Sequence, residues 1–241
     1  MSGDQAQIEG FRAARLRVLE VAGDACTRAG RDPAEVTLVA VSKTVPSVRL
    51  AAAVEAGLTI LGENRVQEAE AKAALLPGAR WHLIGPLQSN KARRAVELFD
   101  VIESVGSADM AVRLDRIAAE AGRAPLDVYL QVNVDRDEAK AGFLPEIVEV
   151  ELPALLELPN LRFLGLMTVG RLAEVPEQAR RTFGQLRELS GRLRDRVGGI
   201  GAGLSMGMSD DYPIAIEEGA TVIRVGRALF GERPGGGAGP A

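Results

Sequence analysis

Lys43 is the residue of this chain whose chemistry is easiest to infer. It follows residues 36–42, an apolar run typical of a parallel strand that is covered on both faces. An ammonium group at the end of such a strand is costly unless it has a partner or a task. One task is nucleophilic, because a lysine in a partly dry site can act as a free amine and form a Schiff base with an aldehyde. The alternative is a side chain that only extends to water.

Two later segments carry the residue types of an anion site. Ser209 stands at the expected start of a helix, where a hydroxyl and free backbone N–H groups can face an anion. Gly226 lets the backbone approach a ligand closely, and Arg227 opens the next turn. A serine cap and a glycine turn without a ligand would explain each loop alone. Together, opposite a strand-end lysine, the two loops favour a phosphorylated aldehyde.

Eight apolar runs that alternate with helical segments would position these residues. The expected strands are 36–42, 58–61, 80–84, 100–103, 126–133, 161–168, 201–205 and 220–224. Eight such units in 241 residues predict an α/β fold, a single (β/α)8 barrel, with its active site at the carboxyl ends of the strands. The alternative is a doubly wound sheet. It would normally have fewer strands and a glycine fingerprint after the first strand, which is absent after residue 42.

The helices have their own sequence signals. Apolar residues recur at helical spacing over residues 5–29 and predict an extra amphipathic helix before the barrel. Residues 174–195, rich in arginine and glutamate, are expected to form the longest later helix, on the outer surface. The serines that could cap other helices are Ser47, Ser89 and Ser107.

Composition excludes several classes of protein. The chain has 29 basic and 33 acidic residues, a net charge of −4, and no long basic tract, so nucleic acid is not an expected partner. The N-terminus lacks the pattern of a signal peptide, and no apolar run approaches the roughly 20 residues that span a bilayer. We therefore expect a cytoplasmic protein with no membrane partner, and a monomer. The barrel is expected over residues 1–232, with a disordered glycine-rich tail over 233–241.

Longer strings give a resemblance that covers most of the chain. They are residues 39–43 (VAVSK), 62–64 (GEN), 82–91 (HLIGPLQSNK), 164–168 (LGLMT), 204–211 (LSMGMSDD) and 224–231 (RVGRALFG). From about residue 10 to Glu232, the chain resembles the pyridoxal phosphate homeostasis family, which shares its barrel with the N-terminal domain of alanine racemases. These strings are far more specific than a lone glycine pattern. Tyr212-Pro213 is a local difference from many relatives, and no functional effect is expected from it.

The resemblance implies a cofactor and a set of binding residues. Lys43 would carry pyridoxal 5′-phosphate (PLP) covalently, as an internal aldimine. The phosphate would be held by Ser209, Gly226 and Arg227, the last two through backbone N–H groups. Arg224 would face the pyridine nitrogen. Four further residues would line the pocket: Asn64, His82, Met167 and Ser205. His82 is also readily explained as a core residue with its hydrogen bonds satisfied.

The implied arginine limits the chemistry. Arginine stays protonated, so it disfavours a proton on the pyridine, and an unprotonated pyridine is a poor electron sink. Alanine racemases work despite this by using two bases, a lysine and a tyrosine from a second domain, and that domain is not expected here. Its own tyrosines are Tyr129, inside an expected strand, and Tyr212, near the phosphate loop and of open role.

Three functions follow from these residues. The first is a non-catalytic carrier that buffers PLP within the cell and could hand it to apo-enzymes that use PLP. The second is a single-domain amino-acid racemase. The third is an aldolase that forms a Schiff base with a sugar phosphate and needs no cofactor. Barrels support all three chemistries, so the fold alone does not choose among them.

Overall fold

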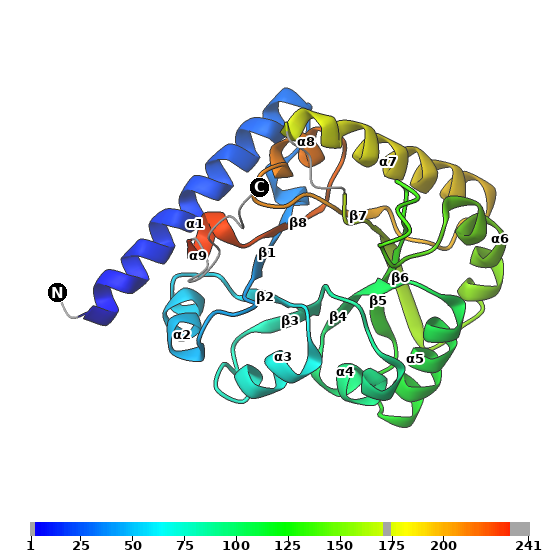
Figure 1. Ribbon diagram of the computed structural model, residues 1–241, viewed down its shortest axis with the longest axis horizontal. Coiled ribbons are helices and arrows are strands. Elements are labelled where there is room, and N and C mark those ends of the chain that lie inside the picture. The colour runs from blue at the N-terminus through cyan, green and yellow to red at the C-terminus, as the bar shows by residue number, and fades with distance from the viewer. Residues whose placement is uncertain (1–2, 171–174, 232–241) are drawn as a thin grey trace.

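The protein is a closed barrel, which excludes the doubly wound sheet. The structure, a computed structural model, describes residues 3–170 and 175–231. Within these ranges eight parallel strands pair in chain order, and β8 pairs with β1 to close the ring (Figure 1). The strands are β1 (Thr37–Val41), β2 (Ile60–Glu63), β3 (Arg80–Leu83), β4 (Val101–Val105), β5 (Leu126–Gln131), β6 (Leu161–Met167), β7 (Gly203–Ser205) and β8 (Val222–Val225).

Helices follow the strands and surround the barrel (Figure 1). They are α1 (Gly3–Arg28), α2 (Ser47–Glu55), α3 (Val66–Ala73), α4 (Ala92–Leu98), α5 (Ala108–Glu120), α6 (Pro145–Leu156), α7 (Ala179–Arg196), α8 (Tyr212–Glu217) and α9 (Arg227–Phe230). Short 3-10 turns precede three of the elements: η1 (Pro33–Glu35), η2 (Ser89–Lys91) and η3 (Pro176–Gln178). None of the described helices is long and apolar enough to cross a membrane.

The expected N-terminal helix is confirmed as α1. Its apolar stripe, which includes Ile8, Phe11 and Val18, is buried against α2, α8 and α9. The Phe11 ring meets that of Phe230 edge to face, with centroids 5.6 Å apart. This contact ties α1 to the short helix that follows β8, because burial of two aromatic rings is worth more than their area alone.

The predicted helix caps are only partly correct. Ser107 caps α5, because its hydroxyl accepts a hydrogen bond of 3.3 Å from the Met110 N–H. Ser47 is instead the first residue of α2, after Pro46, and Ser89 begins a 3-10 turn. The predicted helix over 174–195 is present as η3 and α7, while residue 174 lies outside the described residues. So does the tail expected over 233–241.

The barrel interior changes from apolar to polar along the strands. One buried cluster inside the ring contains Val39, Val101, Tyr129, Met167 and Val222. Two residues further along β4 and β8, the inward positions become Glu103 and Arg224. Because side chains on a strand alternate between faces, these polar groups point into the ring as Val101 and Val222 do. Polar chemistry is therefore concentrated toward the carboxyl ends of the strands, where barrel enzymes carry their sites.

Candidate functional site

Lys43 stands at the mouth of the barrel, two residues beyond Val41, the last residue of β1. Val39 lies in the interior cluster, and Val41 and then Lys43 continue the same face. The Lys43 side chain is half-buried. A tight turn follows, in which the Val45 N–H donates to the Ser42 carbonyl at 3.0 Å. Thr44 in this turn has a φ of 67°, a conformation that costs a β-branched residue free energy.

Two adjoining cavities meet at Lys43. The inner cavity, of about 290 Å³, is lined by Lys43, Asn64 and Arg224, among others. The outer cavity, of about 320 Å³, is lined by Lys43 together with Gly226 and Arg227. Both volumes are near the lower end of the range for small-molecule sites, and a ligand that reached into both would pass the Lys43 side chain. The structure thus brings together Arg224 of β8 and residues that follow β1, β2 and β8, while their contact with a ligand stays a prediction.

The loop after β7 touches the start of α9. The Ser209 hydroxyl accepts hydrogen bonds from the backbone N–H of Gly226 at 3.2 Å and of Ala228 at 3.5 Å. The Arg227 side chain, which is exposed, forms an ion pair with Asp210. The predicted phosphate residues Ser209, Gly226 and Arg227 are therefore neighbours, and the N–H groups of this turn converge on one hydroxyl.

Arg224 is the central cation of the site. Its side chain is 4% exposed. Its Nη1 donates to the Ser205 hydroxyl at 2.6 Å and its Nη2 to the Thr168 carbonyl at 2.7 Å. A guanidinium has five N–H donors, so donors beyond these two remain for a ligand in the inner cavity. Burial lowers the pKa of Arg224, while the charges of Glu103 and Asp211 raise it, and a guanidinium stays protonated under these conditions.

Glu103 balances this charge from β4. Its Oε2 accepts from Ser205 at 2.5 Å and lies 3.9 Å from Arg224 Nη1. Its Oε1 lies 2.6 Å from Nδ1 of His82, which donates because an ionised carboxylate can only accept. Burial alone would raise the pKa of Glu103, but the hydrogen bond and charge of His82, together with Arg224, lower it. The four side chains form one continuous buried network.

The chain is similar to proteins of known family over most of its length. Residues 26–234 match the family described as alanine racemase, N-terminal domain. A Pseudomonas aeruginosa protein named pyridoxal phosphate homeostasis protein is 45% identical over 223 residues, which cover 92% of each chain. An Escherichia coli protein of the same name is 41% identical over 220 residues, covering 87% of this chain and 91% of the relative. The chain belongs to the pyridoxal phosphate homeostasis protein family.

Solved structures agree with this family. PipY of Synechococcus elongatus, solved with PLP bound, is 45% identical with a TM-score of 0.78, and the match covers 88% of this chain and 100% of PipY. An alanine racemase of Clostridium difficile is only 16% identical, with a TM-score of 0.69 over 90% of this chain and 60% of the racemase. At that identity the likeness concerns the fold alone.

Other predicted residues of this family member lie deeper than the cavities. His82 and Ser205 are buried in the network with Glu103, and Met167 belongs to the apolar cluster below it. None of these predicted pocket residues is among those that line the inner or outer cavity. Direct contact between them and a ligand stays a prediction, whereas their contact with one another is given by the structure. Ser205 contacts Arg224 directly, and His82 is linked to Arg224 through Glu103.

Both tyrosines of the chain also lie away from the two cavities. Tyr129 is buried in the apolar cluster, where burial and the charge of Glu103 raise its pKa. Tyr212 begins α8 within the main core, and burial raises its pKa as well. A raised pKa keeps the phenol protonated at neutral pH, which disfavours a role as a base.

A loop that was not expected from the sequence borders the inner cavity. Residues 132–143 leave β5 and return beside it: the Phe143 N–H donates to the Gln131 carbonyl at 2.8 Å, and the Asn133 N–H donates to the Phe143 carbonyl at 2.9 Å. The Asn133 side chain donates to the carbonyl of Asp137 at 2.8 Å and accepts from its N–H at 3.1 Å. These bonds hold residues 139–141 against the cavity. Asn133 itself was visible in the sequence as a polar residue at a strand end, but its loop partners were not.

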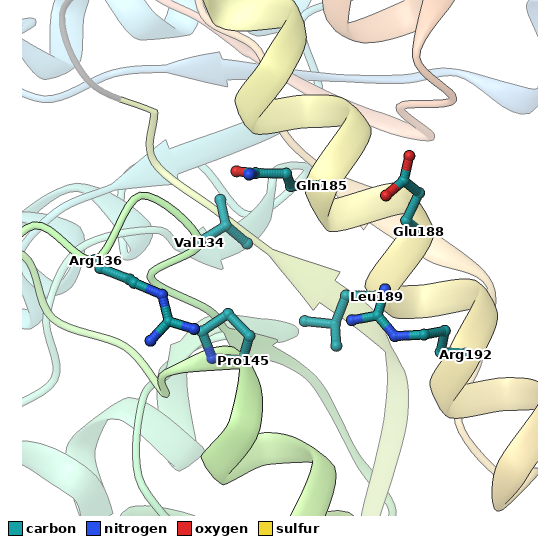
Figure 2. A pocket seen from close by; sticks show the side chains of 7 residues that line it. All are labelled: Val134, Arg136, Pro145, Gln185, Glu188, Leu189 and Arg192. Atoms are coloured by element: carbon teal, nitrogen blue, oxygen red, sulfur yellow. The ribbon is translucent and has the colours of Figure 1, made fainter.

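A separate pocket lies outside the barrel. It lies between α7 and the start of α6 (Figure 2). Its volume is about 270 Å³. Its lining consists of Val134, Arg136, Pro145, Gln185, Glu188, Leu189 and Arg192. Its two arginines are already paired, Arg136 with Glu146 at 2.7 Å and Arg192 with Glu149 at 2.9 Å. Without Lys43 or Arg224, this pocket lacks the groups on which the predicted chemistry depends.

Proposed function

We propose that this protein binds PLP reversibly and acts in PLP homeostasis within the cell, as a carrier and buffer rather than as a strong catalyst. The observation that carries the proposal is the position of Lys43 at the junction of two cavities, one bordered by Arg224 and the other by Gly226 and Arg227. An amine between a cation and an anion-binding turn fits an aldehyde that has a phosphate at one end and a ring nitrogen at the other. The PLP-bound structure of PipY supports the same ligand.

Each group of residues has a proposed role. Lys43 holds the aldehyde carbon covalently through Nζ, as a Schiff base that another amine can displace. Ser209 and the N–H groups of Gly226 and Arg227 hold the phosphate. A Cβ added at Gly226 would meet Val41 only at an ordinary 3.5 Å, so packing inside the protein does not require glycine there. Ligand approach is a sufficient reason for it.

Arg224 is proposed to face the ring nitrogen. Its permanent charge, fixed by Ser205 and the Thr168 carbonyl, would keep that nitrogen unprotonated. The cofactor supplies an electron sink when bound, and this arrangement weakens it. A racemase would also need a second base opposite Lys43, and neither tyrosine borders the cavities. These points favour storage over catalysis, and delivery of PLP to apo-enzymes is an extension of the same proposal.

The direct test is covalent capture of PLP by the purified protein. The wild type should acquire the visible absorbance of a Schiff base, and borohydride followed by peptide mapping should find the label on Lys43. Lys43→Ala should lose both signals. Lys91→Ala, on the 3-10 turn η2 and outside the lining of both cavities, should keep them.

Two results would contradict the proposal. Capture by Lys43→Ala at the wild-type level would reject the anchor. Loss of optical rotation from L-alanine at a normal enzymatic rate would favour the racemase instead.

A further inference from the structure

A buried ion pair lies directly behind Lys43, on the outer face of the barrel. Glu63, at the end of β2, is fully buried, and Lys72 of α3 is nearly so. Lys72 Nζ donates to Glu63 Oε1 at 2.7 Å and to the carbonyl of Ser42 at 2.9 Å. The Ser42 hydroxyl donates to the same Oε1 at 2.7 Å. Because strand residues alternate, Ser42 faces this pair while Lys43 faces the cavities.

The pair holds the peptide unit that leads into Lys43. The Ser42 carbonyl accepts from Lys72 and also from the Val45 N–H at 3.0 Å, and the Ser42 N–H donates to the Gly62 carbonyl at 3.0 Å. With its hydroxyl also bonded, every polar group of Ser42 has a partner. The carbonyl of the peptide between Ser42 and Lys43 therefore accepts two hydrogen bonds, and the N–H of the preceding peptide is bonded as well.

The turn that follows needs such support. Thr44, at φ 67°, occupies a turn position that usually carries glycine or asparagine. A β-branched residue is strained there, and such backbone strain persists only where the surroundings over-determine it. The second donor to the Ser42 carbonyl, Lys72, adds to the turn's own hydrogen bond from Val45.

The ion pair is a poor device for stability alone. Glu63 Oε2 is buried and accepts no hydrogen bond in the described part of the chain. A buried pair with an unsatisfied oxygen can often be replaced by apolar residues without loss of stability. What an apolar pair could not replace is the hydrogen bond from Lys72 to the Ser42 carbonyl.

We propose that Lys72, held in place by Glu63, is a positioning residue for Lys43. By fixing the carbonyl of Ser42 it keeps the strained turn closed and directs the Lys43 amine toward the junction of the two cavities. Condensation joins Lys43 Nζ to an aldehyde carbon and releases one water, so no oxidant or reductant is needed. The part of this inference that concerns capture depends on the proposed PLP function. The part that concerns the turn does not.

The test compares four variants with the wild type. Lys72→Met removes the donor, and Glu63→Gln with Lys72→Met removes it without leaving an unpaired buried carboxylate. Lys72→Arg retains a donor, and Lys91→Met is a matched control outside the cluster. Hydrogen exchange of the Val45 amide, measured without cofactor, reports the turn. Exchange should become at least tenfold faster in the two variants that lack the donor. It should stay near the wild-type rate in Lys91→Met. In Lys72→Arg, exchange should be slower than in Lys72→Met.

Capture of PLP supplies the second readout. The rate of Schiff-base formation should fall at least tenfold in the double variant, while affinity for pyridoxine 5′-phosphate, which has no aldehyde, should change less than threefold. A purely structural role would weaken both ligands alike. If Lys72→Met does not fold, Ser42→Ala tests the same cluster, because it removes one bond to Glu63 and should give an intermediate increase in Val45 exchange.

The possible outcomes separate this inference from the proposed function. Wild-type exchange at Val45 in the double variant overturns the inference, whatever happens to capture. Faster exchange with unchanged capture also overturns it, because the turn would then not direct the amine. If even the wild type captures no PLP, the proposed function fails, and the exchange measurement still decides whether Lys72 fixes the turn.

Discussion

Replacement of Glu103 by glutamine tests whether the network behind Arg224 is electrostatic. The substitution keeps the size of the side chain and an oxygen that can accept from Ser205. It removes the negative charge 3.9 Å from Arg224 Nη1, and it replaces the oxygen that accepts from His82 with an NH2 group. Both Glu103 and Arg224 are buried, so solvent screens their interaction little.

The expected cost follows from this burial. Removal of one partner of a buried ion pair costs about 3–5 kcal/mol, because the remaining charge is left uncompensated. The retained bond to Ser205 places Glu103→Gln near the lower limit, at about 3 kcal/mol. At about 1.4 kcal/mol per factor of ten, the unfolding equilibrium constant should rise roughly a hundredfold at pH 7.

The cost should also depend on pH, with a definite sign. The pKa of Glu103 is lowered in the folded protein, so the folded state holds this proton less tightly than the unfolded chain does. The carboxylate therefore contributes its full stabilisation above the pKa of the unfolded chain, about 4.3. That stabilisation is lost as the pH falls from this value through the lower pKa of the folded protein. The difference between wild type and Glu103→Gln should be largest near pH 7 and shrink steadily below about pH 5.

Urea unfolding followed by fluorescence of Trp81, the single and buried tryptophan, measures this difference. Measurements without PLP at several pH values avoid any contribution from ligand binding. Glu97→Gln, which alters an exposed ion pair with Arg94, is the control and should cost less than about 1 kcal/mol. A cost below about 1 kcal/mol for Glu103→Gln, or one that does not vary between pH 7 and pH 4, would refute the reasoning.

Two further substitutions test packing and backbone strain. Gly203→Ala would place a Cβ 2.6 Å from the Leu164 carbonyl oxygen and 2.8 Å from the Tyr129 ring, and should cost about 1–3 kcal/mol in urea unfolding. Gly191→Ala in α7 has no atom within 4 Å and should instead stabilise by about 0.5–1 kcal/mol; equal effects at the two glycines would contradict the interior contacts. Thr44→Asn should stabilise by about 1 kcal/mol, since asparagine tolerates positive φ better, and an unchanged urea midpoint would argue against strain at this turn.

The fold was largely predictable because parallel strands give continuous apolar runs. All eight expected strands are present, and their ends carry the errors. The second strand was expected over 58–61 and lies at Ile60–Glu63, and the fourth was expected over 100–103 and extends to Val105. The second strand continues to the charged residue Glu63, which hydrophobicity alone assigns to a loop, and the fourth continues two residues past Glu103, where its prediction ended.

The same two carboxylates explain what the sequence did not reveal about the site. Lys43, Asn64, Arg224, Gly226 and Arg227 could be proposed from the sequence because their motifs are contiguous, and all of them border the cavities. The partners of the buried carboxylates are instead distant in sequence. Glu103 gave a weak signal, because a residue two positions after the inward-facing Val101 also points inward. The sequence did not indicate that Arg224 would be its partner.

The apolar cluster around Tyr129 has a consequence for how the family can diversify. This layer, which closes the ring below the charged network, is made by residues that do not border either cavity. The residues that stabilise the barrel interior are thereby separate from the residues that line the cavities. Substitutions at half-buried positions of the barrel mouth, such as Asn64, can change ligand recognition with little loss of folding stability. New specificities can therefore arise without changes to the barrel interior.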